Sequence, residues 1–272
     1  MYVFRRPGTP ALRPFVAALW WLTAPPRKGF DRVTPDGAAA LYIDLAETGI
    51  RTYHPDGRVS ESVTAAAVQG AGTRPVVIAP GELTRHVGVA FHPGGAYPFL
   101  PELPPADTLL PAAELWPGAN ALTDRLRHID DPDRALDTLE TFLTARLHRR
   151  PARALPQVMT ALADGVPVPE VAARFGMTRK RFAAAFQAQV GVSPKRYGRL
   201  RRFRRVFDAT VNVPGPDWAR LAAVHGFHDQ AHLIHEYRSF TGTTPGRYRP
   251  RSPREPNHSP FSTIPGGATA AS

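Results

Sequence analysis

The sequence predicts an α+β fold with a β-rich, barrel-like N-terminal domain that ends in helices, followed by an all-α domain. Three observations predict it. Short apolar runs alternate with turn residues over the first 110 residues, which is typical of strands. Leucines at helical spacing follow these runs. The last part of the chain holds two copies of a helix–turn–helix pattern.

Composition excludes several classes of protein. The chain has 272 residues, 43% of them hydrophobic, which is typical of folded domains with real cores. It has no cysteine, and therefore no disulfide, thiolate metal site or cysteine nucleophile. The longest apolar run, Phe15–Leu22, is far shorter than the roughly 20 residues that span a bilayer. We expect no signal peptide, no membrane segment and a cytoplasmic location.

The β-rich part is predicted from short apolar runs with turns between them. The runs are Phe15–Leu22, Ala39–Leu45, Val76–Ala79 and Val87–Phe91. Proline and glycine are concentrated between the runs, where they favour turns. Strands of this length and spacing favour a small barrel or sandwich.

Helices are predicted from about residue 120. Four leucines share one helix face: Leu136, Leu139, Leu143 and Leu147. Arg149-Arg150-Pro151 breaks this pattern, so we predict domains over residues 1–148 and 149–250. Residues 251–272 are rich in proline, serine, glycine and alanine without an apolar period, and we expect a disordered tail there.

Charge divides the chain at the same boundary. Residues 1–148 hold 14 basic and 16 acidic residues, whereas residues 149–272 hold 20 basic and 7 acidic ones. The C-terminal half is therefore strongly cationic and the N-terminal half is nearly neutral. Such asymmetry indicates a polyanionic partner for the C-terminal half, because nucleic-acid binding requires a cationic surface.

The basic half contains an internal repeat. Val171–Gly176 matches Leu221–Gly226 at an offset of 50 residues. After one inserted residue, Gly191–Pro194 matches Gly242–Pro245. A repeat of this kind can be a structural duplication alone, so its meaning depends on what each copy contains.

Each copy is predicted to form a helix, a tight turn and a second helix. Gly176 and Gly226 occupy the turns, where glycine tolerates a positive φ. Thr178 is a suitable N-cap for the second helix of the first copy, and Phe182 and Phe186 bury one face of that helix. A helix–turn–helix unit places its second helix in the DNA major groove.

The segment between the copies, residues 194–210, is predicted to be a long helix that joins them. One stripe of this helix is apolar. Seven cations in eleven residues surround the stripe: Lys195, Arg196, Arg199, Arg201, Arg202, Arg204 and Arg205. Like charges at this spacing repel one another, so a polyanion or nearby acidic side chains must offset them.

The repeated motifs resemble those of the AraC/XylS family of bacterial transcriptional regulators. The stretches that carry the resemblance are Ala172–Gly191, Gly226–Leu233, Phe240–Gly242, Thr244–Pro245 and Tyr248–Arg249. The resemblance covers about residues 152–250, and both copies and the linker agree in register. The N-terminal half is more weakly similar to the sensor-type domain that is often attached to this module.

The resemblance implies a seven-helix DNA-binding domain and assigns candidate contacts. The base-contact candidates are Lys180, Ala183 and Ala184 in the first copy, and Gln230, Ala231, His232 and His235 in the second. The phosphate-contact candidates are Arg179, Arg181, Lys195, Arg196, Arg199 and Arg202. Phosphate contacts position the protein on DNA, whereas base contacts specify the sequence.

The first copy departs from the family pattern. Long polar side chains are common at the positions of Ala183 and Ala184, and alanine contacts only a thymine methyl group. Base reading by the first copy is therefore expected to depend on Lys180. In the second copy, Gln230 is suited to pair with adenine through two hydrogen bonds.

The N-terminal half is expected to sense a small molecule or to dimerise. Its ligand-pocket candidates are Trp20, Trp21, Tyr42 and Phe91, which would otherwise belong to the core. Duplex DNA is the main predicted partner. A small-molecule effector, RNA polymerase and a second copy of the chain are further candidate partners.

No catalytic set, cofactor site or metal site is predicted. Glu82, His86 and His92 lie close together but lack the spacing of metal-binding cupins. Gly94-Gly95 is not followed by the Lys-Ser/Thr pair of a phosphate-binding P-loop. The alternatives to a sequence-specific regulator are a nonspecific architectural DNA-binding protein, or a metal-dependent barrel enzyme fused to a DNA-binding module.

Overall fold

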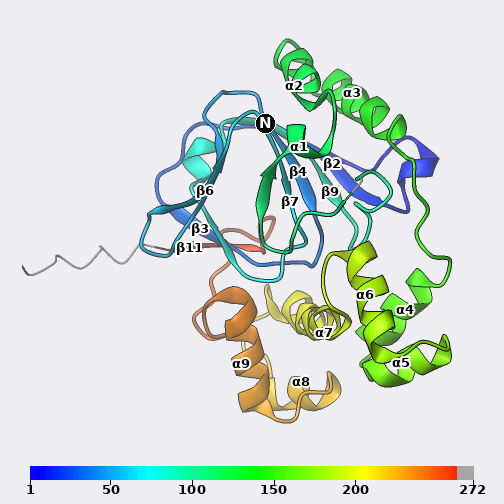
Figure 1. Cartoon of the computed structure of the whole chain (residues 1–272). Helices are drawn as coiled ribbons and strands as arrows, with labels where there is room; N and C mark the ends of the chain where they lie inside the picture. The colour runs from blue at the N-terminus through cyan, green and yellow to red at the C-terminus, as the bar shows by residue number, and fades with distance from the viewer. Residues whose placement is uncertain (101, 262–272) are drawn as a thin grey trace, which may run out of the picture.

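The structure is a computed structural model that describes residues 1–100 and 102–261. Two β-sheets with three helices form the N-terminal part, and a helical part lies beneath them in Figure 1. The predicted α+β class is confirmed. The expected barrel is corrected to a pair of antiparallel sheets that do not close.

Eleven strands make up the two sheets within the described residues. Sheet A runs in the order β1 (Tyr2–Arg5), β2 (Val16–Thr23), β9 (Arg85–Phe91), β4 (Ala40–Asp44), β7 (Ala66–Gln69) and β10 (Leu109–Pro111). Sheet B runs in the order β11 (His258–Phe261), β3 (Phe30–Val33), β8 (Val76–Ile78), β5 (Ile50–Tyr53) and β6 (Val59–Val63). Single 3-10 turns lie at Pro10–Leu12 and Pro80–Glu82.

One face of sheet A packs against helices. These are α1 (Ala112–Leu115), α2 (Ala119–Arg127) and α3 (Pro132–Thr144). The core contains Trp21 and Phe91 from the sheet, and Leu136 and Leu139 from the predicted leucine face of α3. Asp131 caps α3 by accepting a hydrogen bond from the Asp133 N–H at 2.8 Å. Alternation of side chains along a strand explains why this face is apolar.

The opposite face of sheet A, called here the inner face, lies toward sheet B. Ile50 and Val63 of sheet B form a cluster with Ala67 of sheet A, and Tyr42 packs against it. The sheets meet at the β6/β10 side, where the Leu109 N–H donates to Glu61 Oε1 at 3.1 Å. At the other side, β1 and β11 are the outermost strands of their sheets.

His86 on β9 is fully buried beside Asp44, with 3.6 Å between Nε2 and the carboxylate Oδ1. Neither ring nitrogen has a hydrogen-bond partner among the described residues. Burial lowers the pKa of His86 from its ordinary value of 6.5, against the opposing charge of Asp44. The folded protein therefore holds this imidazole neutral, whereas the unfolded chain protonates it below about pH 6.5.

Acid is therefore expected to destabilise the N-terminal domain through His86. The free energy of unfolding should fall by up to about 2 kcal/mol between pH 7 and pH 5, because the unfolded state takes up a proton that the folded state excludes. Urea unfolding at both pH values measures this fall. It should be smaller in His86→Leu, and an equal fall in that variant would assign it to other groups.

Six helices lie between residues 149 and 250. They are α4 (Leu155–Ala163), α5 (Val168–Arg174), α6 (Arg179–Val190), α7 (Pro194–Thr210), α8 (Trp218–Val224) and α9 (Gln230–Thr241). The seventh helix that the family resemblance implies is absent from this stretch. A single turn replaces it, in which the Arg247 and Tyr248 N–H groups both donate to the Thr244 carbonyl.

The predicted disordered tail is wrong for residues 251–261. These residues return to the N-terminal domain, and β11 pairs antiparallel with β3 at the edge of sheet B. Figure 1 shows this red strand beside the blue β3. A short edge strand that contains Pro260 carries little apolar pattern of its own, so composition could not reveal it. The rest of the predicted tail, residues 262–272, lies outside the described residues.

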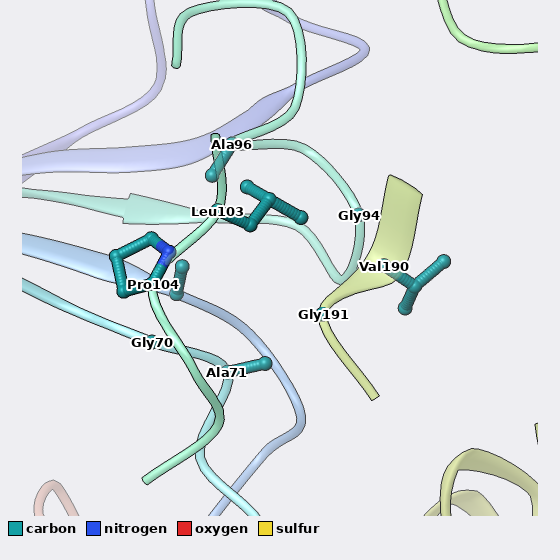
Figure 2. A pocket seen from close by; sticks show the side chains of 9 residues that line it. Gly70, Ala71, Gly94, Ala96, Leu103, Pro104, Val190 and Gly191 are labelled. Atoms are coloured by element: carbon teal, nitrogen blue, oxygen red, sulfur yellow. The ribbon is translucent and has the colours of Figure 1, made fainter. Parts of the chain in front are cut away.

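The end of α6 contacts the N-terminal domain. Figure 2 shows Val190 and Gly191, at the end of α6, beside loops that carry Gly94, Ala71 and Leu103. Ala71 is 4% exposed and belongs to the same hydrophobic cluster as Val190. The pocket between them measures about 10 Å³, which is at most the space of one water molecule. This contact is therefore packed and is not a ligand site.

Candidate nucleic-acid interface

Two helix–turn–helix units are present, and the first consists of α5 and α6. Gly176 makes the turn with a φ of +62°. The Thr178 side chain caps α6 by accepting from the Arg181 N–H at 3.3 Å, as the sequence predicts. Phe182 and Phe186 are buried, with ring centroids 6.2 Å apart. Burial of this face leaves the opposite face of α6 exposed.

The second unit consists of α8 and α9 and follows the same plan. Gly226 makes the turn with a φ of +69°. Asp229 caps α9 by accepting from the His232 N–H at 2.7 Å. Leu233 and Tyr237, which occupy the positions of Phe182 and Phe186 in the second copy of the repeat, are buried. The cap orients the first turn of α9, which is the part that enters a major groove.

Helix α7 joins the two units. Ser193 caps it by accepting from the Arg196 N–H at 3.3 Å, and Pro194 occupies its first turn. Near its start, Tyr197 packs in the cluster of the first unit. Further along, Phe203 and Phe207 pack in the cluster that contains α9 residues. Its 17 residues span about 26 Å at 1.5 Å per residue, so one rigid helix sets the separation of the units.

The base-contact candidates lie on the exposed faces of α6 and α9. Five of them are exposed: Lys180, Ala184, Gln230, Ala231 and His235. Ala183 and His232 are half-buried. The His232 ring packs against Phe227 at 5.5 Å between centroids, and its Nδ1 accepts from the His228 N–H at 3.2 Å. His232 thus has a structural role at the start of α9.

The phosphate-contact candidates fall into two groups. Arg179, Arg181 and Lys195 are exposed. Arg196, Arg199 and Arg202 are half-buried and have intramolecular partners. Only the first group presents its charge fully to solvent.

The intramolecular partners of the second group tie the domain together. Arg196 donates to the Thr73 carbonyl of the N-terminal domain at 2.7 Å, and its guanidinium lies 4.9 Å from the Phe240 ring centroid. Arg202 donates to the Gly226 carbonyl at 3.0 Å, in the turn of the second unit. These arginines offset part of the repulsion along α7 by contacts within the chain.

Arg199 forms a buried ion pair with Glu236 of α9. Its Nε and Nη2 donate to the two carboxylate oxygens at 3.0 and 2.5 Å, and Glu236 is only 3% exposed. Burial opposes ionisation of this carboxyl group, but the Arg199 guanidinium holds the pKa of Glu236 below its usual range. A bidentate pair of this kind fixes orientation as well as distance. It therefore aligns α9 with α7.

A groove of about 580 Å³ opens beside the first unit. Its lining is cationic at Arg179, Lys195, Arg199 and Arg202. Apolar residues around Val166 and Pro167, in the turn before α5, and Ala183 of α6 complete it. The small side chain of Ala183 lines this concave surface.

The four ligand-pocket candidates separate onto the two faces of sheet A. Trp21 and Phe91 are each 2% exposed and lie in the helix-covered core. Trp20 and Tyr42 lie on the inner face, half-buried, with ring centroids 5.8 Å apart. Adjacent residues of a strand point to opposite faces, so Trp20 and Trp21 cannot line one pocket.

The inner face also contains two residues that the sequence did not single out. The Tyr42 hydroxyl donates to Gln69 Oε1 at 3.1 Å, and burial, with a contribution from the charge of Asp36, raises the pKa of Tyr42 to about 12. Gly88 lies beneath Trp20, where an added Cβ atom would come within 2.4 Å of the indole ring. Glycine there lets the indole lie flat on the sheet.

No group of three His, Asp or Glu side chains suitable for a metal ion occurs within residues 1–100 and 102–261. Glu82 instead accepts a hydrogen bond from the Tyr53 hydroxyl at 2.5 Å, and His86 pairs with Asp44. No helix in the described part of the chain is long and apolar enough to cross a membrane.

Comparison with family models covers most of both domains. Residues 171–251 match the model of a helix-turn-helix domain, over a range that begins within α5 and includes α6, α7, α8 and α9. The C-terminal part of the chain therefore contains an AraC-type helix-turn-helix domain. A domain of this type is characteristic of DNA-binding transcription regulators. Residues 5–109 match a domain of unknown function (DUF6597). No curated protein sequence matches the chain.

Solved structures of ToxT from Vibrio cholerae are similar to the AraC-type regulator at low identity. A 1.65 Å structure has 10% identity and a TM-score of 0.45, over 90% of this chain and 96% of ToxT. ToxT from strain O395 has 12% identity and a TM-score of 0.38, over 84% and 90%. A ToxT structure with a bound unsaturated fatty acid has 11% identity and a TM-score of 0.37, over 84% and 88%. The assignment rests on the helix-turn-helix match.

Proposed function

We propose that this AraC-type regulator reads a specific duplex with α6 and α9 in two successive major grooves. The observation that supports it best is the pair of capped helix–turn–helix units on one rigid helix, each with an exposed second helix. Successive major grooves on one DNA face are about 34 Å apart. Lys180 and Gln230 are proposed to read bases, and Arg179, Arg181 and Lys195 to hold phosphates.

Gln230→Ala tests base reading by the second unit. We expect it to lose about 1–3 kcal/mol of discrimination at one base pair, because glutamine pairs with adenine through two hydrogen bonds. Competition binding with single-base variants of the selected duplex measures this. Gln157→Ala, an exposed glutamine on α4, is the matched control and should bind as the unmodified chain does. Equal weakening on all sequences would favour the architectural alternative.

Lys180→Ala is the corresponding test of the first unit. The alanines at 183 and 184 leave Lys180 as the long side chain among its base-contact candidates. The variant is expected to remove the base preference of the first element and to leave that of the second element unchanged. If both elements weaken together, Lys180 holds a phosphate instead.

We also propose that the inner face of sheet A binds a small apolar effector. Support comes from Trp20 and Tyr42, two aromatic side chains on the inner face that are only partly buried. Gln69 and the Tyr42 hydroxyl supply the few polar groups that orient a ligand. As a partner of chromosomal DNA, the regulator is proposed to act in the bacterial cytoplasm. RNA polymerase and a second copy of the chain remain proposed partners.

A thermal-shift screen of small molecules tests this placement. Ligands of the inner face are expected to raise the melting temperature of the unmodified chain but not of Trp20→Leu. Trp218→Leu, which changes a half-buried tryptophan in the C-terminal domain, should keep the response. A response that survives Trp20→Leu would contradict the proposed site.

A further inference from the structure

The segment that follows the second helix–turn–helix unit leads back into the N-terminal domain. Residues 249–261, called here the return segment, leave α9 after the turn at Thr244–Tyr248 and end as β11. The register is continuous from His258 opposite Val33 to Phe261 opposite Phe30. The second unit is therefore attached to the N-terminal domain at a point far from the linker before α4.

Asp31 anchors the return segment in sheet B. It is 1% exposed, and its carboxylate accepts hydrogen bonds from both Nε, at 2.6 Å, and Nη2 of Arg251. His258 Nδ1 lies 3.4 Å from the same carboxylate. A buried carboxylate is costly unless it is paired, and both of these partners come from the return segment. The N-terminal domain thus carries an acidic group that the return segment neutralises.

Tyr248, the residue just before the return segment, is fixed to the second unit. Tyr248 is 5% exposed, and its ring packs at 5.2 Å from Phe207 of α7 and 6.0 Å from Tyr237 of α9. Its hydroxyl donates to the Pro256 carbonyl at 2.8 Å and lies 3.2 Å from Thr34 Oγ1. One side chain therefore contacts α7, α9, the return segment and Thr34, the residue that follows β3.

The return segment also lies beside the open edge of the sheets. β11 and β1 are the outermost strands on that side. Tyr2 on β1 is 62% exposed, and partial desolvation together with the charge of Glu255 in the return segment raises its pKa. Tyr2 pairs with Leu22, and Phe4 with Trp20, so these β1 side chains share the inner face with the proposed effector residues.

We propose that the return segment couples the N-terminal domain to the second reading helix, with Asp31 as a positioning residue for α9. The pairing of Asp31 with Arg251 keeps β11 in place, and β11 keeps Tyr248 packed against α7 and α9. A ligand that displaces β11 then acts on the second unit. The effector part of this inference rests on the proposed function.

The first unit has separate contacts, so the two units can be distinguished. Ala71 and Gly94 of the N-terminal domain contact the end of α6, and Gln189 Oε1 accepts from the Ala152 N–H in the linker before α4. None of these contacts involves residues 249–261. Release of the return segment is therefore expected to weaken reading of the second DNA element and to spare the first.

Arg251→Gln and Arg254→Gln form a matched pair that tests the coupling. Each removes one positive charge from the return segment, but Arg254 is exposed whereas Arg251 holds Asp31. The duplex selected by the unmodified chain is compared with one whose second element is scrambled. Arg251→Gln should bind the complete duplex about tenfold more weakly and the scrambled duplex as before. Arg254→Gln should match the unmodified chain on both.

Two shortened chains make the same comparison without a point substitution. A chain that ends at residue 250 lacks β11 and should behave as Arg251→Gln does. A chain that ends at residue 261 keeps β11 and should bind as the full chain does. The proposal is overturned if both shortened chains bind alike, if Arg251→Gln and Arg254→Gln weaken binding equally, or if the scrambled duplex is weakened as much as the complete one.

Hydrogen exchange gives a readout that does not depend on DNA. Arg251→Gln should speed amide exchange at the C-terminal end of α9 at least threefold, with α6 unchanged. If α9 exchanges as in the unmodified chain, the coupling is refuted even where DNA binding is normal. If the chain enriches no duplex but α9 loses protection, the coupling stands and the sequence-reading proposal fails.

Discussion

Phe203→Ala is expected to lower the free energy of unfolding of the C-terminal domain by about 3–5 kcal/mol and to abolish binding to a two-element duplex. Phe203 lies near the middle of α7 and is 1% exposed. Its ring stacks on Phe240 at 4.8 Å and contacts Tyr237 edge-on at 5.5 Å. Alanine leaves a cavity where α7 meets α9, so the second unit loses its support.

Chemical unfolding followed by circular dichroism measures this loss. Phe175→Ala is the matched control, because Phe175 is 39% exposed at the end of α5 and its removal leaves no enclosed cavity. The control should change the free energy of unfolding by less than about 1 kcal/mol. Equal destabilisation by both variants would show that α7 does not hold the units together through this cluster.

Glu236→Ala is expected to weaken binding to the two-element duplex about tenfold or more. The variant removes the carboxylate that receives both donors of Arg199, so α9 is no longer aligned with α7. Removing one partner of a hydrogen-bonded ion pair commonly costs about 1–3 kcal/mol. The Arg199 side chain is 33% exposed, so water takes up part of its freed charge and the lower part of that range applies to stability.

Glu170→Ala controls for the loss of one negative charge from the domain. Glu170 pairs with Arg174 on the surface of α5, where both side chains are more than half exposed. Such pairs contribute about 0–1 kcal/mol, so binding should stay within about threefold of the unmodified chain. If Glu170→Ala weakens binding as much as Glu236→Ala, net charge and not helix alignment controls affinity.

The helix–turn–helix units could be predicted because their signals are local. Gly176 and Gly226 both adopt the positive φ that their turns require, and Thr178 caps α6 as expected. Ala172 and its match Ala222 are buried, as are Phe182 and Phe186 and their matches Leu233 and Tyr237. Each of these features depends on a few neighbouring residues, so a single sequence contains enough information to place them.

The structure differs from the predictions where contacts between residues far apart in the sequence determine the local structure. β11 exists because β3 offers it an edge and Asp31 offers it a charge, about 220 residues earlier in the chain. The roles of Arg196, Arg199 and Arg202 depend on Thr73, Glu236 and Gly226, which a count of cations along α7 cannot reveal.

The sequence also could not show which ligand-pocket candidates lie on the same face of sheet A. Trp20 and Trp21 are adjacent in sequence and both are ligand-pocket candidates, yet strand alternation places them on opposite faces of the sheet. The helix-covered face of β2 is determined by its packing against α3. This is a tertiary contact, which the sequence of β2 alone does not reveal.

Selection of binding sites from a random duplex pool, at about 150 mM salt, tests the central claim most directly. At this salt concentration, nonspecific attraction to phosphates is substantially screened. Two rigidly joined units predict one enriched motif with two elements about ten base pairs apart. Lys180→Ala should remove the preference at one element and Gln230→Ala at the other. Enrichment of no motif, or of a motif that neither substitution alters, would contradict sequence reading by these two helices.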